Sequence, residues 1–121
     1  MRIFSPVIQG LGSALELYQA RHRVLAENVA NAETPGYRAR DLEFGTALAS
    51  AFERGTTSGR AAADVEPIVD ARSVVKIDGN SVDLDTEMAR LSENTMKIVA
   101  LTRILTRKYE GLKAAIEGSR R

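Results

Sequence analysis

The first third of the chain repeats apolar side chains in alternating steps of three and four residues. This spacing is the a/d pattern of a helix that buries one face against a partner. Ser5 followed by Pro6 predicts the start of the helix, because a hydroxyl cap and a proline both suit a helix N-terminus. The positions of the repeat are Ile8, Leu11, Leu15, Tyr18, His22, Leu25, Val29 and Ala32. We therefore expect one long helix, with His22 as a partly buried residue that sets its register, and a stop at Thr34–Tyr37.

The last third shows the same spacing over a longer stretch. Asp83 is the expected N-cap, and the acidic side chains that follow it suit the positive end of the helix dipole. The repeat positions are Leu84, Met88, Leu91, Thr95, Ile98, Thr102, Leu105, Tyr109, Leu112 and Ile116. The sequence therefore predicts a C-terminal helix over residues 83–118. It is expected to pair with the N-terminal helix and turn of residues 1–37 as an elongated, coiled-coil-like pair.

Residues 38–82 lack such a repeat and are expected to form an irregular arm. Apolar positions within residues 41–54 predict one short amphipathic helix in this arm. Gly55–Gly59 contains only glycine, serine and threonine, which is the composition of a flexible linker. The arm is therefore expected to be an irregular connection between the two long helices.

A second element is expected later in the arm. The segments Ser73–Ile77 and Ser81–Val82 flank the turn residues Asp78-Gly79-Asn80, a pattern that indicates a small β-hairpin or an extended arm with a turn. The chain has 121 residues, enough for one small domain and too few for two ordinary ones. We therefore expect residues 1–121 to form a single all-α domain.

Both long helices carry apolar side chains outside the repeat. Two paired helices bury one stripe each, so a wider stripe leaves apolar surface uncovered. The additional positions are Val7, Leu17, Val24, Met96, Val99, Leu101 and Ile104. We therefore expect self-assembly or a place in a larger complex.

The composition argues against most chemical activities. The chain has no cysteine and a single histidine, which excludes disulfides, thiolate catalysis and metal sites built from Cys or several His. The formal net charge of +1 does not indicate a nucleic-acid binder. No dinucleotide fingerprint, phosphate loop or EF-hand pattern is present. We therefore expect no catalytic, cofactor-binding or metal site.

The sequence also gives no sign of a membrane segment. No stretch approaches the roughly 18 uninterrupted apolar residues that a membrane span needs. Residues 2–17 contain no apolar run of the kind that precedes a signal-peptide cleavage site. We expect neither a direct membrane span nor a cleaved signal peptide.

Charge is unevenly distributed along the chain. Residues 64–87 hold seven acids and two bases, whereas residues 97–113 hold five bases and one acid. The two regions cancel in the total, so the asymmetry predicts contacts between segments or between copies of the chain.

The stretch from Ala26 to Tyr37 stands apart from this background. Asn28 and Asn31 lie three residues apart near the expected end of the helix, and Tyr37 follows the turn as an apolar anchor with a polar tip. An ordinary helix stop explains the second asparagine and the Pro-Gly pair, but not the whole string.

The whole string resembles the N-terminal signature of the bacterial flagellar rod and hook proteins, Asn-x-x-Asn-x-x-Thr-x-Gly-Tyr/Phe. The matching positions are Asn28, Asn31, Thr34, Gly36 and Tyr37. A second similarity covers Gly79–Met88, Thr102–Leu105 and Lys108–Ile116, and it is to the short, proximal-rod members of that family.

The resemblance implies a structural subunit of the proximal rod of the flagellar basal body, part of the drive shaft and required for flagellum assembly and motility. Such subunits are exported by the flagellar type III apparatus without a cleaved signal peptide and lie in the periplasmic rod. The implied partners are other rod subunits (copies of this chain and the FlgC, FlgF and FlgG types), the FliE-type ring–rod junction protein and the MS ring.

The resemblance also suggests roles for individual residues. The turn motif would set the chain direction after the first helix and lock neighbouring subunits; it comprises Asn28, Asn31, Thr34, Pro35, Gly36 and Tyr37. The helix seam would supply the core contacts of the assembly, through Leu11, Leu15, Leu25, Val29, Leu91, Ile98, Leu105 and Leu112.

Two alternatives remain open from the sequence. One is another short rod protein of the FlgC type, against which the ending Gly111–Ile116 argues. The other is a soluble coiled-coil adaptor or export chaperone that never enters a filament. An enzyme is more distant than either, because the sequence offers no residues for a catalytic pocket.

Overall fold

The computed structural model describes residues 6–54 and 65–119. Three helices account for most of this part of the chain, so the prediction of an all-α protein is confirmed. The elements are α1 (Pro6–Ala30), β1 (Arg40–Asp41), α2 (Phe44–Arg54), β2 (Ile68–Val69) and α3 (Leu84–Ser119). The expected cap Ser5 and the expected linker Gly55–Gly59 lie outside the described residues.

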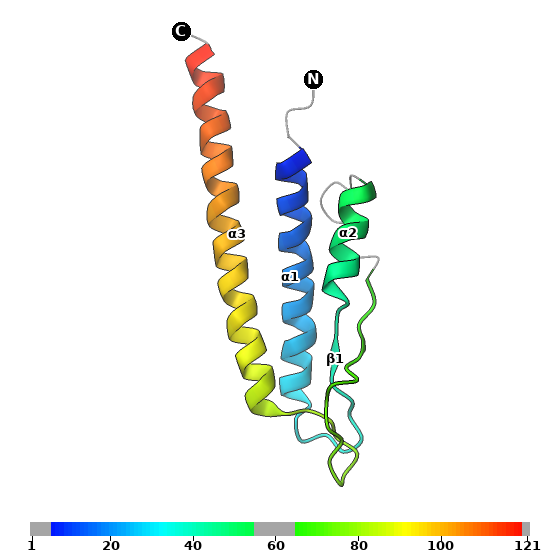
Figure 1. The fold of residues 1–121 in the computed structure, drawn as a ribbon. Helices are drawn as coiled ribbons and strands as arrows, with labels where there is room; N and C mark the ends of the chain where they lie inside the picture. Colours follow the sequence, from blue (N-terminus) through cyan, green and yellow to red (C-terminus); the bar gives the residue numbers. More distant parts are fainter. Residues whose placement is uncertain (1–5, 55–64, 120–121) are drawn as a thin grey trace.

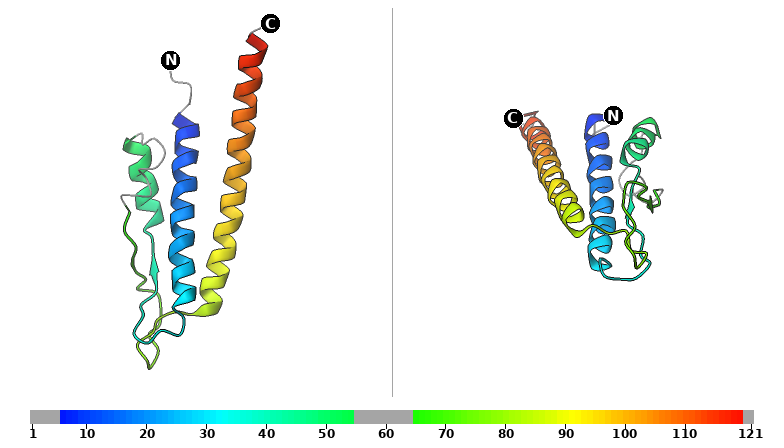
Figure 2. Two further views of the ribbon diagram at one scale, coloured as in Figure 1. Left: turned by 180° about the vertical axis from the view of Figure 1, so that it is seen from behind. Right: turned by 60° about the horizontal axis from the view of Figure 1, so that its bottom comes forward.

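The two long helices run antiparallel, and α1 lies between α3 and α2 (Figure 1). Views from behind and from below show the same order (Figure 2). α1 has 25 residues and α3 has 36, which correspond to about 37 Å and 54 Å of helix. The predicted elongated pair is therefore present, with a third, short helix packed on its other side.

The helix boundaries follow the local chemistry of their first residues. α1 begins at Pro6, where the missing N–H leaves no donor unsatisfied. Asp83 caps α3, since its Oδ1 accepts the backbone N–H groups of Asp85 at 3.1 Å and Thr86 at 3.4 Å. The prediction of Asp83 as an N-cap is thus confirmed.

The buried apolar core lies between α1 and α2. Leu17 packs against Ala47 and Ala51 of α2. Further down the same side of α1, Ala20 and Val24 form a second cluster with Leu42. The expectation that Leu17 and Val24 seek partners outside the chain was wrong, because α2 and the segment before it cover them. The heptad repeats do not reveal this contact, since the pattern of an 11-residue helix is too short to indicate which surface the helix covers.

Small side chains on α1 allow α2 to come close. A Cβ atom on Gly10 would overlap the ring of Phe52, so the absence of a side chain at Gly10 is needed for this packing. Ser13 and Ala14, which follow on α1, are also buried. The glycine that weakens helix propensity at this point therefore has a packing role.

The predicted seam is only partly correct for α3. Leu105 is buried, and Leu91, Ile98 and Leu112 are half-buried. Between them, the buried or half-buried positions are Glu87, Asn94 and Leu101, instead of the predicted Met88, Thr95 and Thr102, which are exposed. At every second position of the repeat, the buried residue is thus the one before the predicted residue. At two of these positions the buried residue is polar, Glu87 or Asn94, and has a hydrogen-bond partner between the two helices.

Two buried polar contacts set the register of α3 on α1. Asn94 is fully buried and its Nδ2 donates to the carbonyl oxygen of Tyr18 at 2.8 Å. Nearer the lower end, Glu87 accepts from Asn28 at 3.1 Å. His22, the expected register residue, is half-buried, and its Nδ1 has no hydrogen-bond partner in the described part of the chain.

The small sheet joins two segments of the arm for which the sequence predicted no strands. β1 and β2 pair antiparallel, with Arg40 opposite Val69 and Asp41 opposite Ile68. Ser73–Ile77 and Ser81–Val82 form the second predicted alternative, an arm with a turn, and neither segment is a strand. The N–H of Lys76 donates to the carbonyl oxygen of Asn80 at 2.8 Å across this turn, while the N–H of Ser81 bonds elsewhere, as described below.

Candidate functional site

Asn28, the first asparagine of the turn motif, is fully buried and uses its whole amide group. Its Nδ2 donates to the carbonyl oxygen of Arg40 at 2.7 Å, and its Oδ1 accepts the N–H of Arg40 at 3.0 Å. The side chain therefore pairs with the backbone of β1 as a neighbouring strand would. Oδ1 also accepts from the hydroxyl of Tyr37 at 3.2 Å.

The second asparagine, Asn31, acts locally. Its Nδ2 donates to the carbonyl oxygen of Glu27 at 2.9 Å, and its Oδ1 accepts from the Thr34 hydroxyl at 3.1 Å. The first bond reaches back to the last turn of α1 and the second lies within the turn that follows it; both are exposed to solvent. Asn31 thus shapes the end of α1, whereas Asn28 connects α1 to the arm.

Gly36 and Gly79 meet where the two motifs approach each other. Gly36 has φ +76° and Gly79 has φ +83°, the left-handed conformation that favours glycine. The N–H of Gly36 donates to the carbonyl oxygen of Asp78 at 3.0 Å. A Cβ on Gly79 would lie 3.2 Å from the Cα of Gly36, so the two turns pack backbone to backbone.

Asn80 of the second motif completes the end of α1. Fully buried, it donates through Nδ2 to the carbonyl oxygens of Asn31 at 2.9 Å and Thr34 at 2.7 Å. Those carbonyls follow a helix C-terminus, where the helix itself supplies no donor. Next to it, Ser81 donates its N–H to the carbonyl of Tyr37 and accepts the N–H of Ala39 on Oγ. We call this meeting of the residues 28–40 and 78–87 the motif junction.

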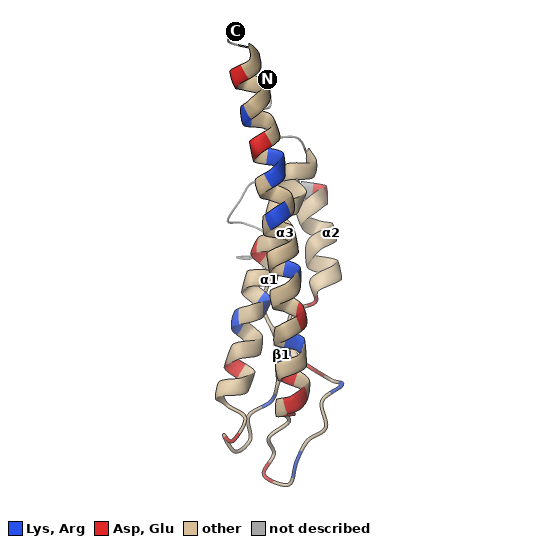
Figure 3. Ribbon diagram, turned by 90° about the vertical axis from the view of Figure 1, so that its left-hand side faces the viewer, with Lys and Arg blue, Asp and Glu red and all other residues tan. Residues whose placement is uncertain are grey.

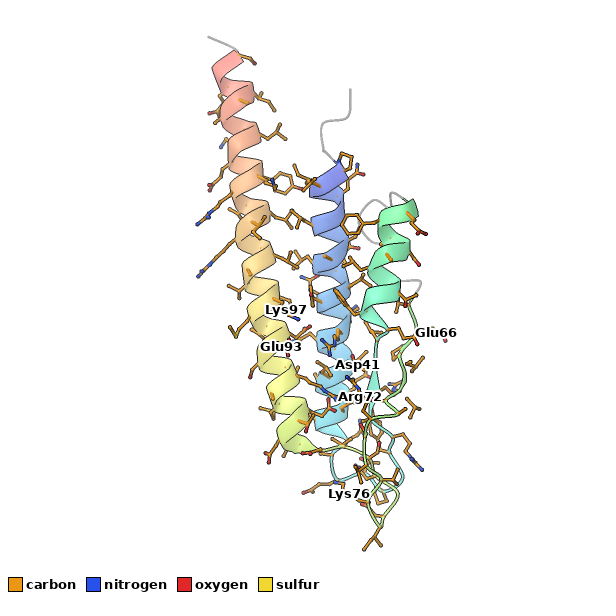
Figure 4. The ribbon with its side chains drawn as sticks, viewed as in Figure 1. Asp41, Glu66, Arg72, Lys76, Glu93 and Lys97 are labelled. Atoms are coloured by element: carbon orange, nitrogen blue, oxygen red, sulfur yellow. The ribbon has the colours of Figure 1, made fainter. Side chains whose placement is uncertain are left out.

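A chain of ion pairs extends from the motif junction along the inside of the arm. Arg21 of α1 binds both carboxylate oxygens of Asp41, at 2.9 Å and 3.0 Å. Arg72 contacts Asp70 at 2.9 Å and Asp41 at 3.4 Å; Figure 4 shows Arg72 near Asp41. Arg90 of α3 reaches Asp70 at 2.8 Å. These ion pairs thus connect α1, the arm and α3 through one continuous series of charged side chains.

Hydrogen bonds between these side chains shift the pKa values of Asp70 and Arg21. The guanidinium of Arg72, hydrogen-bonded to Asp70, holds the pKa of that carboxyl well below its usual range, and Arg90 adds to the effect. The hydrogen bond to Asp41 raises the pKa of Arg21 in turn. Because Asp70 and Asp41 are buried, their carboxylates depend on these arginines for compensation.

The remaining residues of the predicted turn motif lie at the surface. Thr34, Pro35 and Gly36 are exposed at the lower tip, and Tyr37 is half-buried. Of the seam positions on α1, Leu25 is buried, while Leu11, Leu15 and Val29 are half-buried. The structure therefore brings the motif together as a structural joint and leaves its outer edge accessible.

Several residues of the motif junction and of the adjoining ion pairs were not predicted as site residues. Asn80, Glu87, Asp70 and Arg90 join segments that are far apart in the chain, such as Asn28 and Glu87, 59 residues apart. One signal was available: Glu87 and Asn94 are polar and lie one heptad apart beside an otherwise apolar repeat. Two polar residues at this spacing are compatible with a solvent-facing side of the helix. They are equally compatible with polar contacts buried between two paired helices.

The hydrogen bonds and ion pairs described above connect α1, the arm and α3 to one another. Within residues 6–54 and 65–119, no three His, Cys, Asp or Glu side chains are grouped so as to hold a metal ion. Across the same residues, no helix is long and apolar enough to cross a membrane. The surface features that remain are exposed apolar side chains, which are most frequent on α3 and in the arm.

Comparison with known proteins identifies the family. A family model described as flagella basal body rod protein matches residues 8–38, which cover most of α1 and the turn motif. The chain is 36% identical over 114 residues to flagellar basal body rod protein FlgB of Cereibacter sphaeroides, covering 87% of this chain and 89% of the relative. The protein of the same name from Salmonella typhimurium is 33% identical over 122 residues, covering 87% and 88%. That from Bacillus subtilis is 29% identical over 129 residues, covering 99% and 100%. The chain therefore belongs to the FlgB family of flagellar basal body rod proteins.

Proposed function

We propose that this chain is a structural subunit of the proximal rod of the flagellar basal body, required for flagellum assembly and motility and without catalytic activity. The observation that carries the proposal is the similarity to relatives named flagellar basal body rod protein FlgB over 87% of the chain. A FlgC-type member or a soluble adaptor is not favoured, since such a length of similarity to FlgB proteins would then have no explanation.

The surface of α3 supports a role in assembly. Its large apolar side chains are exposed by between 43% and 72%, which is unusual for a helix in a chain that acts alone. They are Leu84, Met88, Met96, Val99, Ile104, Tyr109 and Ile116. The hydroxyls of Thr102 and Thr106 donate to carbonyl oxygens four residues earlier in α3. These two donors therefore need no hydrogen-bond partner from a neighbouring subunit. Neighbouring subunits can bury it.

The site residues divide into two roles in this proposal. Asn28, Asn31, Gly36 and Tyr37 hold the turn, while the exposed Thr34 and Pro35 meet neighbouring subunits. The seam positions on both long helices supply apolar contacts within and between subunits: Leu11, Leu15, Leu25, Val29, Leu91, Ile98, Leu105 and Leu112.

The location and partners follow from the same proposal. The subunit is exported by the flagellar type III apparatus without a cleaved signal peptide and lies in the periplasmic part of the basal body. Its partners are copies of itself, rod proteins of the FlgC, FlgF and FlgG types, the FliE-type ring–rod junction protein and the MS ring. We propose neither a nucleic-acid partner nor a direct membrane span; among residues 6–54 and 65–119, no helix is suited to crossing a membrane.

The test is a deletion of the gene followed by electron microscopy of hook–basal bodies. Rings without a rod, restored by the wild-type chain, are expected. An export chaperone would give the same rings, so the complemented basal bodies are also probed with an antibody against this chain. Labelled rods support the proposal; complete rods in the deletion strain, or basal bodies that lack the chain, overturn it.

A further inference from the structure

Arg72 of the arm lines two cavities at once. The first, which we call the α3 cavity, has a volume of about 340 Å³ and opens between the arm and the first turns of α3. Its apolar lining consists of Val74, Val82 and Leu84. The second, the sheet cavity, has a volume of about 400 Å³ and opens beside β2. Its apolar lining consists of Leu42, Ile68, Val69 and Ala71. Both volumes are those of small ligand sites, and we call the two cavities together the arm site.

The guanidinium of Arg72 is held in place by acids of the chain and still has an unused edge. Its Nε and Nη2 donate to the two carboxylate oxygens of Asp70, at 2.9 Å and 3.1 Å, and Nη2 also reaches Asp41 at 3.4 Å. Among the residues that the structure describes, none accepts a hydrogen bond from Nη1. Nη1 lies on the edge of the guanidinium opposite these bonds, and 66% of the side chain is exposed. It can therefore donate to a carboxylate from outside the chain.

A second base lies in the same part of the arm. Lys76 lines the α3 cavity and is exposed, and its ammonium group forms no ion pair with any residue of the described ranges. Figure 4 shows Lys76 at the lower end of the arm, below Arg72. The α3 cavity therefore has two cationic groups that a ligand can reach.

The acids that line the α3 cavity are already bound within the chain. Glu87 is 1% exposed and accepts from Asn28, and Asp83 caps α3 through its Oδ1. The sheet cavity is lined by one exposed acid, Glu43. The negative charge of a ligand is therefore most favourable beside the two bases, on the side of the α3 cavity.

Exposed apolar side chains accompany the two bases along the arm. Ile68, Val69, Val74, Val75 and Ile77 are exposed by between 44% and 109%, and Figure 3 shows basic positions in blue on the same loop. An apolar surface of this kind marks a contact with another protein, and its bases call for a partner that supplies acids. The upper part of α3 in a second copy does not meet this requirement, because residues 97–113 hold five bases and one acid.

We propose that the arm site binds an extended segment of another protein, in which one acidic side chain lies between two apolar ones. The carboxylate pairs with Nη1 of Arg72 and with Lys76, and the two apolar side chains enter the α3 cavity and the sheet cavity. Apolar burial and a charge-assisted hydrogen bond together hold the segment. The inference goes beyond the proposed function, because it gives the arm a partner of its own and stands whether or not the chain is a rod subunit.

Fluorescence polarisation of labelled peptides tests the proposal on the full-length chain. The probes are Gly-Leu-Ser-Glu-Ser-Leu-Gly and a longer form with three serines on each side of the glutamate. In an extended segment both spacings place the two leucines and the glutamate on one face. One control peptide carries glutamine in place of the glutamate, and another carries serine in place of both leucines.

At least one glutamate peptide should bind with a Kd of about 0.1 mM. Both control peptides should bind at least about tenfold more weakly. No binding of either glutamate peptide at about 2 mM protein would overturn the proposal. So would equal binding of the glutamine peptide, which removes the role of the bases, or of the serine peptide, which leaves an anion site only.

Variants of the chain locate the contact. Lys76→Glu, Val74→Asp and Ile68→Asp change a base, the α3 cavity and the sheet cavity in turn, each at an exposed position. Each should weaken peptide binding at least about tenfold while the circular dichroism of the helices stays unchanged. Lys113→Glu is the matched control on the upper part of α3 and should bind like the wild type. Wild-type affinity in any of the three arm-site variants would contradict the proposed contact.

Sedimentation equilibrium of the unlabelled chain tests a second copy as the occupant. Self-association that Lys76→Glu abolishes, or that the glutamate peptide reverses, would assign the arm site to a second copy and overturn the proposal. A chain that stays monomeric, or whose self-association neither the variant nor the peptide changes, supports a partner other than a copy.

Discussion

Replacing Asn28 by alanine is the sharpest test of how the motif works. The change removes four hydrogen bonds of a fully buried side chain, two of them to the backbone of Arg40 and one each to Tyr37 and Glu87. A hydrogen bond contributes about 0.5–1.5 kcal/mol net, and a buried group left without a partner costs more. Because Arg40 is only half-buried and water can reach part of it, we expect a loss of about 3 kcal/mol.

Asn31→Ala is the matched control, because the same residue type lies three positions away in the same motif. Its two bonds are local and exposed, to the carbonyl of Glu27 and the hydroxyl of Thr34. Water replaces such bonds readily, so the loss should be about 0.5 kcal/mol. The two asparagines should therefore differ by about 2–3 kcal/mol in the free energy of unfolding.

The assay is urea denaturation followed by far-UV circular dichroism. With a slope of about 1.5 kcal/mol per molar urea, the Asn28→Ala midpoint should fall by about 2 M and the Asn31→Ala midpoint by a few tenths. Asn28→Asp adds a test of polarity, since it keeps the shape, removes both donors and adds a carboxylate near that of Glu87. It should destabilise at least as much as alanine at neutral pH. Equal losses for the two alanine variants, or less than about 1 kcal/mol for Asn28→Ala, would refute the reasoning.

Two further changes address the ion pairs and the turn. Arg72 and Arg90 depress the pKa of Asp70, so its carboxylate stabilises the fold above its unfolded pKa of about 3.9, and this contribution is lost as the pH falls through the lower folded pKa. Asp70→Asn should therefore cost about 2 kcal/mol at neutral pH and less near pH 2, in urea titrations at both pH values; an equal loss at both would contradict the assignment. Gly36→Val should cost about 2 kcal/mol, because a β-branched side chain is strained at φ +76°, and Gly36→Asn should cost less. Unfolding and rod yield measure both variants, and wild-type motility with a full yield of rods for Gly36→Val would count against a role for the turn.

Much of the fold could be predicted from local pattern. The 3–4 spacing gave both long helices, and Pro6 and Asp83 marked their starts, because caps and helical periodicity depend on residues close together in the chain. The left-handed conformation of Gly36 was also foreseeable, since a Pro-Gly pair after a helix leaves few other conformations.

The parts that were missed depend on partners far away in sequence. Glu87 and Asn94 look like solvent-facing positions, yet they are buried because Asn28 and the Tyr18 carbonyl, 59 and 76 residues distant, meet their hydrogen-bonding groups. The sequence correctly indicates Asn80 as a turn residue. It does not show that Asn80 caps the end of α1, because that contact depends on tertiary packing. Of the two alternatives for this segment, the structure has the arm with a turn and not the hairpin, because Ser81 bonds to Tyr37 and Ala39 instead of a hairpin partner.

Glu87 and Asn94 are both polar side chains buried between the two long helices. Their burial is related to how a subunit of an assembly is stabilised. A chain that must offer apolar surface to its neighbours cannot bury all of that surface in its own core. Its helices then need another means of fixing their register, and buried hydrogen bonds provide it because each pairs well in only one alignment. In this chain Asn28, Asn94 and Glu87 fix α3 on α1, while Met88, Val99 and Tyr109 of α3 stay at the surface. Polar groups inside and apolar groups outside are therefore two consequences of the same requirement.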